Sequence, residues 1–578
     1  MHSSLSFAAI PALLLSLAAA VPAAAAAQPS PAAPASQTKA EKAAVARVTA
    51  AEISGHLRFL SDDLLEGRKP GTRGSSLAIA YIAAQLEAFG LSPGAPAAEG
   101  ATRSFLQPVP LMRLTGRLPG KVEFRAADAK EGAPLALSTG GGVEADLVLK
   151  PDAPVDFAKV EDAELVFAGY GIVAPEYGWD DYKDVDVRGK IVVLLNFNPP
   201  FAGEVDGKRV RLWYGRWDYK YQTAAAHGAA GVYIIHTTES AGYPWQVLAN
   251  SADAVRFDLP PHGEPRLQFQ GWVTDGAAHR LFALGGKDLD ALRGQATGAG
   301  AKDFKPVSLG VRSSLTMPVE RRTIRSGNVI GMVPGTDPLL RGEAVVFTAH
   351  HDHLGTVPSA EPGKDGIYNG ALDNASGVSA ILTMAHAALL APPRRSLYFC
   401  FVTAEEQGLL GSRWLAQHPP VPAGRIAADI NIDSFNKWGL TNDVGLLGLG
   451  KSSLDAVVRQ AAAEQGRTVH GDPFPDRGSF YRSDMFELAR AGVPPVALKG
   501  GPSYVGRPEG WGRAQHEAFE RKDYHQPSDE YHGDWDLDGA VQDAQLDLVI
   551  GLRVANAPRL PEWTPGDEFE AARKAAAR

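Results

Sequence analysis

Cysteine is almost absent from this sequence: among 578 residues there is one, Cys400. A single thiol excludes an intrachain disulfide framework and a zinc knuckle built from several cysteines. Cys400 lies in the apolar run Leu-Tyr-Phe-Cys-Phe-Val, so we expect a small core residue rather than a nucleophile. The pattern G-x-S-x-G is also missing, which argues against a serine hydrolase of the α/β type.

The chain also has no excess of basic residues. It carries 57 Lys and Arg against 66 Asp and Glu, for a formal net charge of −9. A broad surface for nucleic-acid phosphates is therefore not expected. Hydrophobic residues make up 45% and charged residues 21%, which is typical of globular chains and excludes wholesale disorder. The length predicts two or three domains.

Long apolar runs are confined to the amino terminus. Residues 1–27 combine an apolar stretch with small residues in the A-x-A pattern, which predicts a secretory signal peptide cut before Gln28. Residues 28–45 are rich in Ala, Pro and Ser and are expected to form a flexible leader. We therefore expect an exported protein, periplasmic or extracellular, with no membrane span in its mature form.

The pattern of apolar residues changes along the rest of the chain. Helical spacing of apolar residues predicts a helical region from Ala51 to Phe89, and residues 144–300 contain short β-rich runs between Gly, Pro and Asp. From about 301 to 560, apolar strands alternate with helices, which predicts an α/β fold: a mixed, mostly parallel sheet flanked by helices. The expected strands are Ala344–Thr348, Leu397–Thr403, Ala428–Ile432 and Pro495–Leu498, and the expected helices are Val378–Leu390, Leu454–Glu464 and Leu537–Ala557.

Metal-binding residue types follow these strands at their carboxyl ends, where open α/β sheets bind ligands. They are His350, Glu405, Glu406 and Asp433; Asp373 lies between the first two strands, just before a helix, and a later loop adds His525. Imidazole and carboxylate ligands without thiolate suit zinc, with manganese and cobalt as alternatives. Two adjacent metal ions need a bridging carboxylate, and hydrolysis needs a further carboxylate as base. The Glu405-Glu406 pair offers one ligand and one base.

With these residues in place, the sequence resembles the M28 family of zinc peptidases over most of the chain after the leader. The matching motifs are AHHDHLG (349–355), GALDNASG (370–377), AEEQGLLGS (404–412), NIDS (431–434) and DYHQPSDE (523–530). Two further segments are similar to family regions: HLRFLSDDLLEGRKPGTRGS (56–75) to an amino-terminal helix region, and SDMFELARAGVPPVAL (483–498) to a strand-entry segment.

The resemblance implies a role for each candidate residue. His350 and Asp433 would bind one zinc ion, Glu406 and His525 a second, and Asp373 would bridge the two. Glu405 would be the general base for a hydroxide that bridges the metals. The remaining implied roles are an orienting carboxylate at Asp352, an oxyanion contact at Tyr524 and a cis peptide bond between Asp373 and Asn374.

The resemblance also implies a domain organisation. Residues 46–143 would be the first part of the peptidase domain, 144–300 an inserted protease-associated domain, 301–560 the main part with the metal site, and 561–578 a C-terminal tail. We expect the aromatic run from Trp213 to Tyr221 to pack the insert against the peptidase, or otherwise to line the cleft.

Residues next to the ligands in sequence are expected to have supporting or substrate-binding roles. Alternation along an extended chain should turn His351 and His353 away from the site, in supporting roles. Arg477, Arg482 and Lys499 precede the last ligand and are candidates for binding a substrate carboxylate.

The expected function is an exported zinc exopeptidase acting on peptides, with aminopeptidase as the first choice. A carboxypeptidase or an N-acyl amino acid amidohydrolase of the same fold is the alternative, and a non-catalytic binding protein is the third. The complete set of ligands with Glu405 argues against the third. Oligomeric state is left open.

Overall fold

The structure is a computed structural model that describes residues 37–96, 102–128, 133–140, 142, 144–205, 207–250, 254–261, 263–357 and 364–577. The predicted signal peptide, residues 1–27, and residues 28–36 of the expected leader lie outside the described residues. The leader prediction is wrong for residues 39–45, which belong to helix α1 (Lys39–Arg47). The side chains of Thr38 and Glu41 each accept a hydrogen bond from the other's backbone N–H, a capping box that starts this helix.

One sheet carries the strands that lead into the candidate site. Its parallel strands lie in the order β19 (Ser396–Val402), β16 (Ala344–His350), β20 (Ile426–Asn431) and β23 (Pro495–Gly500). Antiparallel neighbours extend it: β15 (Val307–Val333) beside β19, and β21 (Asp443–Leu446) beside β23. The strand β22 (Thr468–His470) then pairs in parallel with β21. The predicted α/β fold with a mixed sheet is confirmed.

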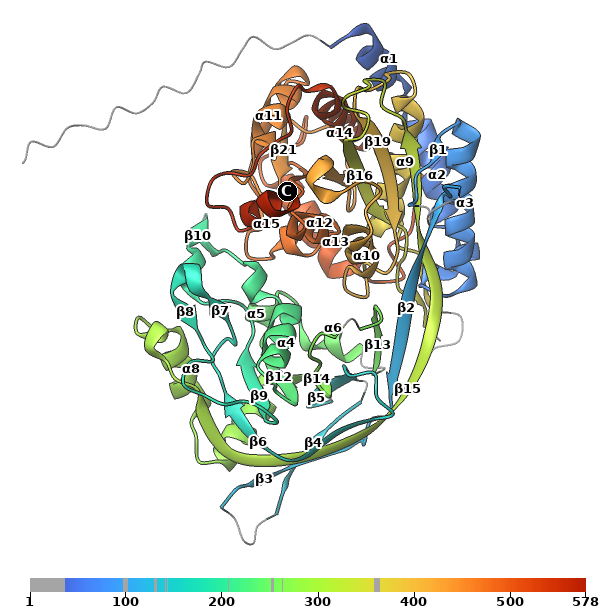
Figure 1. Cartoon of the computed structure of the whole chain (residues 1–578). Coiled ribbons are helices and arrows are strands. Elements are labelled where there is room, and N and C mark those ends of the chain that lie inside the picture. Colours follow the sequence, from blue (N-terminus) through green and yellow to red (C-terminus); the bar gives the residue numbers. More distant parts are fainter. Residues whose placement is uncertain are drawn as a thin grey trace, which may run out of the picture. The chain divides into compact units, whose positions relative to one another are not determined.

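Helices cover this sheet, and the most buried of them is α9 (Ser376–Ala388). All of its residues except His386 are buried, which is the pattern of a helix enclosed by protein. It packs against β16, α2 (Ala50–Leu60), α3 (Arg73–Phe89) and α14 (Asp538–Asn556) (Figure 1). The other helices of this region are α10 (Leu410–Gln417), α11 (Leu454–Glu464), α12 (Met485–Arg490), α13 (Trp511–Lys522) and α15 (Glu570–Ala576).

The helical region expected from Ala51 to Phe89 is interrupted between α2 and α3. A 3₁₀ segment, η1 (Asp63–Arg68), lies between them, and Glu66, Gly67 and Arg68 have positive φ angles of 49°, 64° and 49°. These angles lie outside the α-helical region, so the chain turns there. The turn places Arg68 in the interior, where its side chain supports the candidate site.

A second sheet is built from the β-rich part of the chain. Its parallel strands lie in the order β6 (Phe157–Phe167), β9 (Ile191–Leu195), β12 (Gly231–His236) and β14 (Phe269–Thr274), followed by antiparallel β5 (Leu147–Pro151). The flanking helices are α4 (Trp217–Ala226), α7 (Asp275–Leu284) and α8 (Leu289–Thr297). The main hydrophobic cluster of this sheet extends from Leu114 to Val319, and so draws on residues on both sides of the 144–300 range.

The strand β15 runs through both sheets (Figure 1). Its first part pairs with β3 (Lys121–Ala126) and β6, and its second part pairs with β2 (Leu106–Gly116) and β19. The sequence analysis missed this strand, because residues 320–323 in its middle are exposed and mostly charged and interrupt the alternation of buried and exposed positions. Shorter strands of the β-rich part of the chain include β4 (Leu135–Ser138), β10 (Glu204–Val205), β11 (Lys208–Arg209) and β13 (Val255–Asp258).

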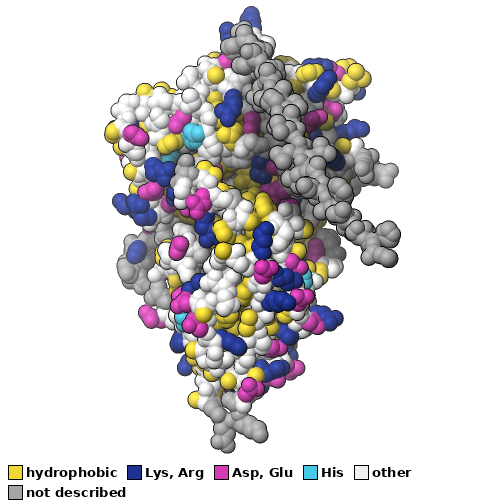
Figure 2. Space-filling model, turned by 90° about the vertical axis from the view of Figure 1, so that its left-hand side faces the viewer, with side chains coloured by type: hydrophobic (Ala, Val, Ile, Leu, Met, Phe, Trp, Pro, Cys, Tyr) yellow, Lys and Arg dark blue, Asp and Glu magenta, His cyan; other side chains and the backbone are white. Residues whose placement is uncertain are grey.

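The lengths of the apolar helices and the distribution of surface charges agree with the amino-acid composition. In the part of the chain that the structure describes, no helix has the length and apolar character needed to cross a bilayer. The face shown in Figure 2 mixes acidic and basic side chains without a large field of either sign. Such mixing fits the near-balanced charge of the sequence.

Candidate metal centre

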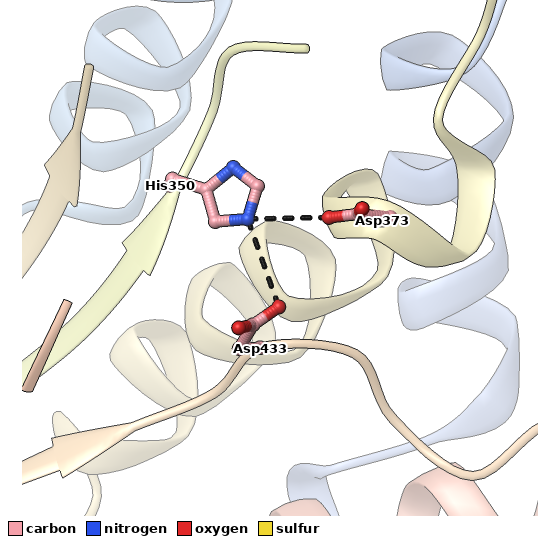
Figure 3. A group of neighbouring side chains, drawn as sticks. All are labelled: His350, Asp373 and Asp433. Carbon is pink, nitrogen blue, oxygen red and sulfur yellow. Dashed lines mark ion pairs between the residues drawn. The ribbon is translucent and has the colours of Figure 1, made fainter. Parts of the chain in front are cut away.

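The predicted ligands meet where neighbouring parallel strands end. His350 is the last residue of β16 (Figure 3). Glu405 and Glu406 follow β19, and Asp433 follows β20. Because β16 pairs with both β19 and β20 in parallel, these carboxyl ends share one edge of the sheet.

Asp373 reaches the same edge from the turn before α9. Gly370 precedes this turn with a φ of 55°, and a Cβ there would lie 2.2 Å from the carbonyl oxygen of Asp373, so glycine is required. The backbone N–H groups of Leu372 and Asp373 donate hydrogen bonds of 3.0 Å to the carboxylate of Asp529. The peptide bond after Asp373 is cis, as the resemblance implied.

The carboxylate of Asp373 lies between two imidazoles. Its Oδ1 is 3.3 Å from Nε2 of His350, and its Oδ2 is 3.1 Å from Nε2 of His525. Asp433 Oδ1 lies 3.7 Å from the same nitrogen of His350 (Figure 3), and Glu406 Oε2 lies 3.1 Å from that of His525. The cluster therefore has two halves, each with one imidazole and one carboxylate, and Asp373 has one oxygen in each half.

The charges of this cluster fit bound cations. Burial alone lowers the pKa of His350, but Glu405, Asp373 and Asp433 raise it well above its ordinary value. His525 behaves in the same way, since Glu406 raises its pKa well above 6.5 in spite of burial. Both Nε2 atoms are buried without a hydrogen bond of normal geometry among the described residues. Imidazole nitrogens and carboxylate oxygens that together favour a bound positive charge are suitable ligands for zinc, and for manganese or cobalt.

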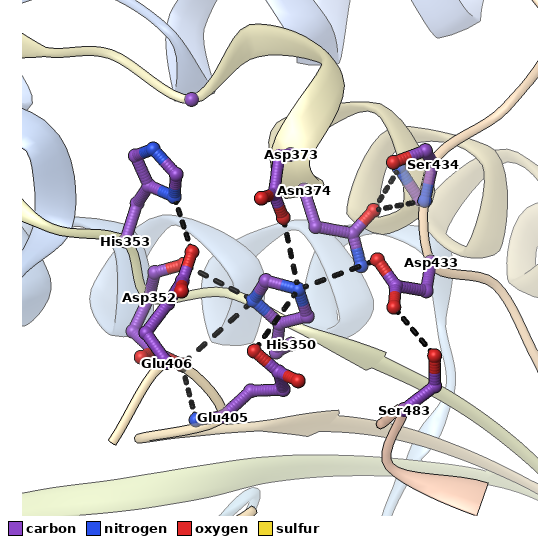
Figure 4. A network of polar contacts seen from close by, with 12 residues as sticks. His350, Asp352, His353, Asp373, Asn374, Glu405, Glu406, Asp433, Ser434 and Ser483 are labelled. Atoms are coloured by element: carbon purple, nitrogen blue, oxygen red, sulfur yellow. Dashed lines mark hydrogen bonds and ion pairs between the residues drawn. The ribbon is translucent and has the colours of Figure 1, made fainter. Parts of the chain in front are cut away.

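The outer carboxylates of the cluster stay ionised, as metal ligands must. Burial acts to raise the pKa of Glu406, but His525 and His353 lower it to about 2. In Asp433, burial is outweighed by Lys499 and His350, and the pKa is likewise about 2. Ser483 Oγ also donates a 2.6 Å hydrogen bond to Asp433, which orients that carboxylate (Figure 4).

Glu405 occupies a different position from the ligands. Its Oε2 lies 3.9 Å from Nε2 of His350, and its side chain is 13% exposed. Burial, together with Glu406 and Asp433, raises its pKa well above the ordinary value. The carboxylate of Glu405 thus lies beside the cluster and not between its imidazoles. A position beside the cluster is the one expected of a group that accepts a proton from water.

The imidazole of His350 is oriented by a backbone carbonyl and not by the expected carboxylate. We expected the carboxylate of Asp352 to orient this ring. Instead, its carbonyl oxygen lies 3.2 Å from Nδ1 of His350, which must carry the hydrogen because a carbonyl only accepts. The carboxylate of Asp352 lies 4.0 Å away and accepts a 3.1 Å hydrogen bond from the backbone N–H of Glu405 (Figure 4).

The two histidines beside the first ligand take opposite directions. His351 turns away from the cluster, with Nε2 3.1 Å from the carbonyl oxygen of Gly327. His353 instead lies with Nδ1 2.6 Å from Oε1 of Glu406 (Figure 4). The expected alternation fails for His353 because strand β16 ends at His350. His353 also forms a compact group with Asp373 and Glu406 that has the spacing of a metal site.

Arg68 is a site residue that could not be recognised from sequence alone. This arginine is 1% exposed, and its guanidinium donates hydrogen bonds to the carbonyl oxygens of His351 (2.9 Å) and Gly370 (3.0 Å). It also donates to the carbonyls of Leu60 and Asn369. Arg68 therefore links the loop after β16 to the turn before Asp373. The motif GRKPGT was the available signal, but its role depends on contacts far away in sequence.

Tyr524 lies beside the second half of the cluster. Its ring stacks on that of His525, with centroids 3.9 Å apart and an interplanar angle of 22°. Its hydroxyl lies 3.2 Å from Nη2 of Arg482. Burial raises the pKa of Tyr524 to about 12, so the hydroxyl keeps its proton at neutral pH and can donate a hydrogen bond.

A cavity of about 1800 Å³ opens in front of the cluster. Its walls include Glu405 and His525 from the first sheet's region and Tyr221 and Arg211 from the second. The aromatic run expected to join the two regions does so through Trp213, whose ring lies 4.7 Å from that of Phe486, and Trp217 and Tyr221 also line the cavity.

Comparison with known proteins gives one family match. Residues 328–549 match the model of peptidase family M28, and this range holds every predicted ligand. No curated protein matches the chain.

Solved structures similar to this chain include three from bacteria. An aminopeptidase from Aneurinibacillus sp. strain AM-1 is 18% identical, with 91% of this chain and 98% of that one covered and a TM-score of 0.49. A zinc aminopeptidase from Bacillus subtilis is 18% identical (92% and 97% covered, TM-score 0.41). A peptidase M28 precursor from Shewanella amazonensis is 17% identical (91% and 99% covered, TM-score 0.42).

The family match covers the strands, the turn before α9 and the loop of His525, which are the segments that build the cluster. Residues 328–549 therefore form a domain of peptidase family M28, and the chain is a metallopeptidase.

Proposed function

We propose that this chain is an exported aminopeptidase that uses two zinc ions to remove N-terminal residues from peptides. One observation carries the proposal: each oxygen of the Asp373 carboxylate faces a different imidazole, His350 on one side and His525 on the other. A carboxylate in that position suits a pair of metal ions, because it offsets their mutual repulsion. The Bacillus subtilis structure is named a zinc aminopeptidase, and the Aneurinibacillus structure is named an aminopeptidase.

The residues that would hold the metals are those of the cluster. His350 and Asp433 would hold one zinc ion, Glu406 and His525 the other, and Asp373 both. Bound zinc would polarise the scissile carbonyl and make a water molecule more acidic.

The chain's own residues would carry out the proton transfers. Glu405, free of the ligand positions, would accept the proton of the attacking water and pass it to the leaving amine as the peptide C–N bond breaks. The hydroxyl of Tyr524 would donate a hydrogen bond to the oxygen that gains negative charge. Asp352 would hold the backbone of Glu405 in place through the N–H bond.

The domain organisation and the destination of the protein are part of the proposal. We propose that the second sheet is a protease-associated insert, and its contribution to the cavity walls supports a role beside the substrate. The apolar segment with its A-x-A pattern supports cleavage before Gln28 and export to the periplasm or beyond.

The test of the function uses one short peptide in three forms: free, N-acetylated and C-amidated. Each is incubated with the purified mature protein, with and without a chelator. We expect chelator-sensitive cleavage that requires the free amine. Cleavage that tolerates acetylation or requires the free carboxylate would instead establish the alternative, a carboxypeptidase or amidohydrolase of the same fold.

The role of Glu405 is tested by Glu405→Gln. This change removes the proton acceptor but no proposed ligand, so kcat should fall by about 10²- to 10⁴-fold while bound zinc stays at the wild-type level. Metal analysis by mass spectrometry on the same sample checks the second part. Loss of zinc from this variant would contradict the assignment of Glu405 as base.

A further inference from the structure

Arg482 is a cation next to the candidate metal centre, and no carboxylate of the described residues forms an ion pair with it. It follows the short helix η8 (Ser479–Tyr481) and precedes Ser483, the hydrogen-bond donor to Asp433. Its side chain is exposed in the wall of the cavity. The hydrogen bond of 3.2 Å to Tyr524 engages one of its N–H groups. Within the described ranges, no carboxylate lies within 4.0 Å of its guanidinium nitrogens.

Arg211, from the segment between β11 and α4, contributes a second positive charge to the cavity lining. Its guanidinium donates to the backbone carbonyls of Asp476 (3.1 Å), Gly215 (3.2 Å) and Ser240 (2.6 Å). Three of its five N–H donors are thereby used, and none of them by a carboxylate in the part of the chain that the structure describes. The ring of Phe197 lies 4.2 Å from the guanidinium carbon. These contacts hold the side chain in one position without neutralising its charge.

The two guanidinium groups are near enough to affect each other. Burial lowers the pKa of Arg211 to about 9, and the charge of Arg482 is the next contribution. Tyr243 lines the cavity with them: both arginines act to lower the pKa of its hydroxyl, which burial raises. All three side chains line the same cavity. An anion between them would relieve the repulsion and gain donors from each.

Several other arginines that line the cavity are paired with carboxylates, unlike Arg482 and Arg211. Arg216 pairs with Asp218 at 3.1 Å, and Arg413 pairs with Glu487 at 3.3 Å. Arg477 is paired with Glu520. These three arginines are thus paired with carboxylates, whereas Arg482 and Arg211 have no ion pair with a carboxylate among the described residues.

We propose that Arg482, with Arg211 and Tyr243 beside it, binds a carboxylate of the peptide substrate close to the scissile bond. This inference rests on the proposed function and deepens it by naming a substrate class, peptides that carry an anionic group next to the cleaved residue. Guanidinium binds carboxylate through parallel N–H bonds, and Tyr243 can add a hydroxyl donor. The carboxylate comes either from the C-terminus of a dipeptide or from an acidic side chain.

The test compares three substrates that separate these sources. They are leucyl-leucine, its C-terminal amide, and leucyl-glutamate with an amidated C-terminus. We expect the wild-type enzyme, loaded with zinc, to cleave at least one carboxylate-bearing substrate with a kcat/KM about 10- to 100-fold above that of leucyl-leucine amide, which is typical of a charge-assisted contact. Preference for leucyl-leucine assigns the C-terminal carboxylate, and preference for the glutamate peptide assigns the side chain.

The deciding variant is Arg482→Gln, with Arg507→Gln as matched control. Arg507 is exposed, lies outside the cavity lining and has no role in the site. Arg482→Gln should bring kcat/KM for the preferred carboxylate substrate down to that for leucyl-leucine amide, while Arg507→Gln should keep the wild-type ratio of the two. Equal losses on the amide and the free acid would overturn the proposal and assign Arg482 to support of Tyr524 alone.

A binding measurement separates failure of this proposal from failure of the proposed function. Calorimetry of leucyl-leucine, its amide and the glutamate peptide on Glu405→Gln protein, with and without Arg482→Gln, needs no turnover. A carboxylate-dependent gain in affinity that Arg482→Gln removes supports the subsite even if no peptide is cleaved. Equal affinity for all three ligands overturns the subsite, and cleavage by the wild-type enzyme would then leave the peptidase function standing.

Discussion

Two buried clusters of charged side chains line the same cavity, and they differ in how their negative charge is balanced. In the metal-binding cluster, carboxylates face imidazoles: His350, Asp373, Glu406, Asp433 and His525. In a second cluster, which we call the arginine cluster, carboxylates face guanidinium groups: Asp152, Asp258, Arg256, Arg266 and Arg413.

The two clusters differ in whether their charges are balanced without a bound ligand. Asp258 lies 2.6 Å from Arg256 and also pairs with Arg266, and these charges keep its pKa below the ordinary range in spite of burial. Guanidinium is charged at every physiological pH, so the arginine cluster needs no ligand. Imidazole is neutral or charged depending on pH, so the metal-binding cluster depends on protons or metal ions. The same residue type, aspartate, therefore has a structural role in one cluster and, in the proposed function, a metal-binding role in the other.

The largest effect is expected from Asp373→Ala. This change removes the carboxylate that contacts both imidazoles, so we expect loss of bound zinc and a fall in kcat/KM of at least about 10³-fold. Inductively coupled plasma mass spectrometry and the peptide assay measure the two effects. The matched change Asp258→Ala should leave the zinc content unaltered, and full zinc occupancy in Asp373→Ala would break the distinction between the clusters.

Asp258→Ala should instead act on stability. It leaves Arg256 and Arg266 with Asp152 as their remaining acidic partner in the cluster, and breaking a buried ion pair costs about 3–5 kcal/mol. Urea denaturation of the zinc-loaded protein, followed by fluorescence, measures the loss. A change below about 1 kcal/mol would mean that the arginine cluster is as well solvated as a surface ion pair.

Arg68→Lys tests the support behind the metal-binding cluster. Lysine keeps the charge but loses the planar fork that bonds the carbonyls of His351 and Gly370. We expect zinc affinity to fall about 10- to 100-fold, as for other residues that hold metal ligands in place. Competition with a fluorescent zinc chelator measures the affinity. Unchanged affinity in a stably folded variant would show that Arg68 serves the fold and not the metal centre.

The smallest expected effect is on the pH dependence of thermal stability. The metal-free protein should show this dependence, and bound metal should remove part of it. In metal-free protein, His350 and His525 have pKa values raised well above 6.5, so the folded state holds more protons and loses stability as pH rises above 6.5. Glu406 and Asp433, with pKa values of about 2, lose their contribution as pH falls below about 4.5. The thermal midpoint should therefore be highest between these limits and fall towards pH 8.5.

Zinc should abolish the alkaline part of this dependence, since it replaces the protons. Differential scanning fluorimetry from pH 5 to 8.5, with and without zinc, checks both curves. Asp258→Asn is the control: Asp258 is ionised in both states above pH 5, so this variant should keep the alkaline decline. A midpoint that is flat from pH 6 to 8.5 without metal would contradict the assignment.

Much of the site was predictable from sequence because its residues follow local patterns. Apolar runs identified the strands that end near His350, Glu405 and Asp433, and the family motifs supplied the order of the ligands. The capping of α1 was also readable in principle, since Thr38 and Glu41 have the spacing of a capping box. That signal was outweighed by the composition of the leader.

Other features depend on contacts between distant segments. Arg68 lies hundreds of positions from the carbonyls it holds, and nothing in its own motif states which loops it will meet. His353 faces Glu406 because β16 ends at His350, and a strand end is set by the pairing of β16 with β19 and β20. The strand β15 was missed for a similar reason: its partners change from one sheet to the other along its length.

By itself, the sequence determined the α/β fold and the chemical identity of the candidate metal-binding residues, since periodicity and residue type are local properties. Only the tertiary structure decided that Asp373 lies between two imidazoles, that the carbonyl of Asp352 supports His350, and that Arg482 meets the cavity without a carboxylate partner within the described residues. The physical reason is that side-chain direction and charge balance follow from packing. Residues far apart in the chain must be brought together before it is settled which charges are paired.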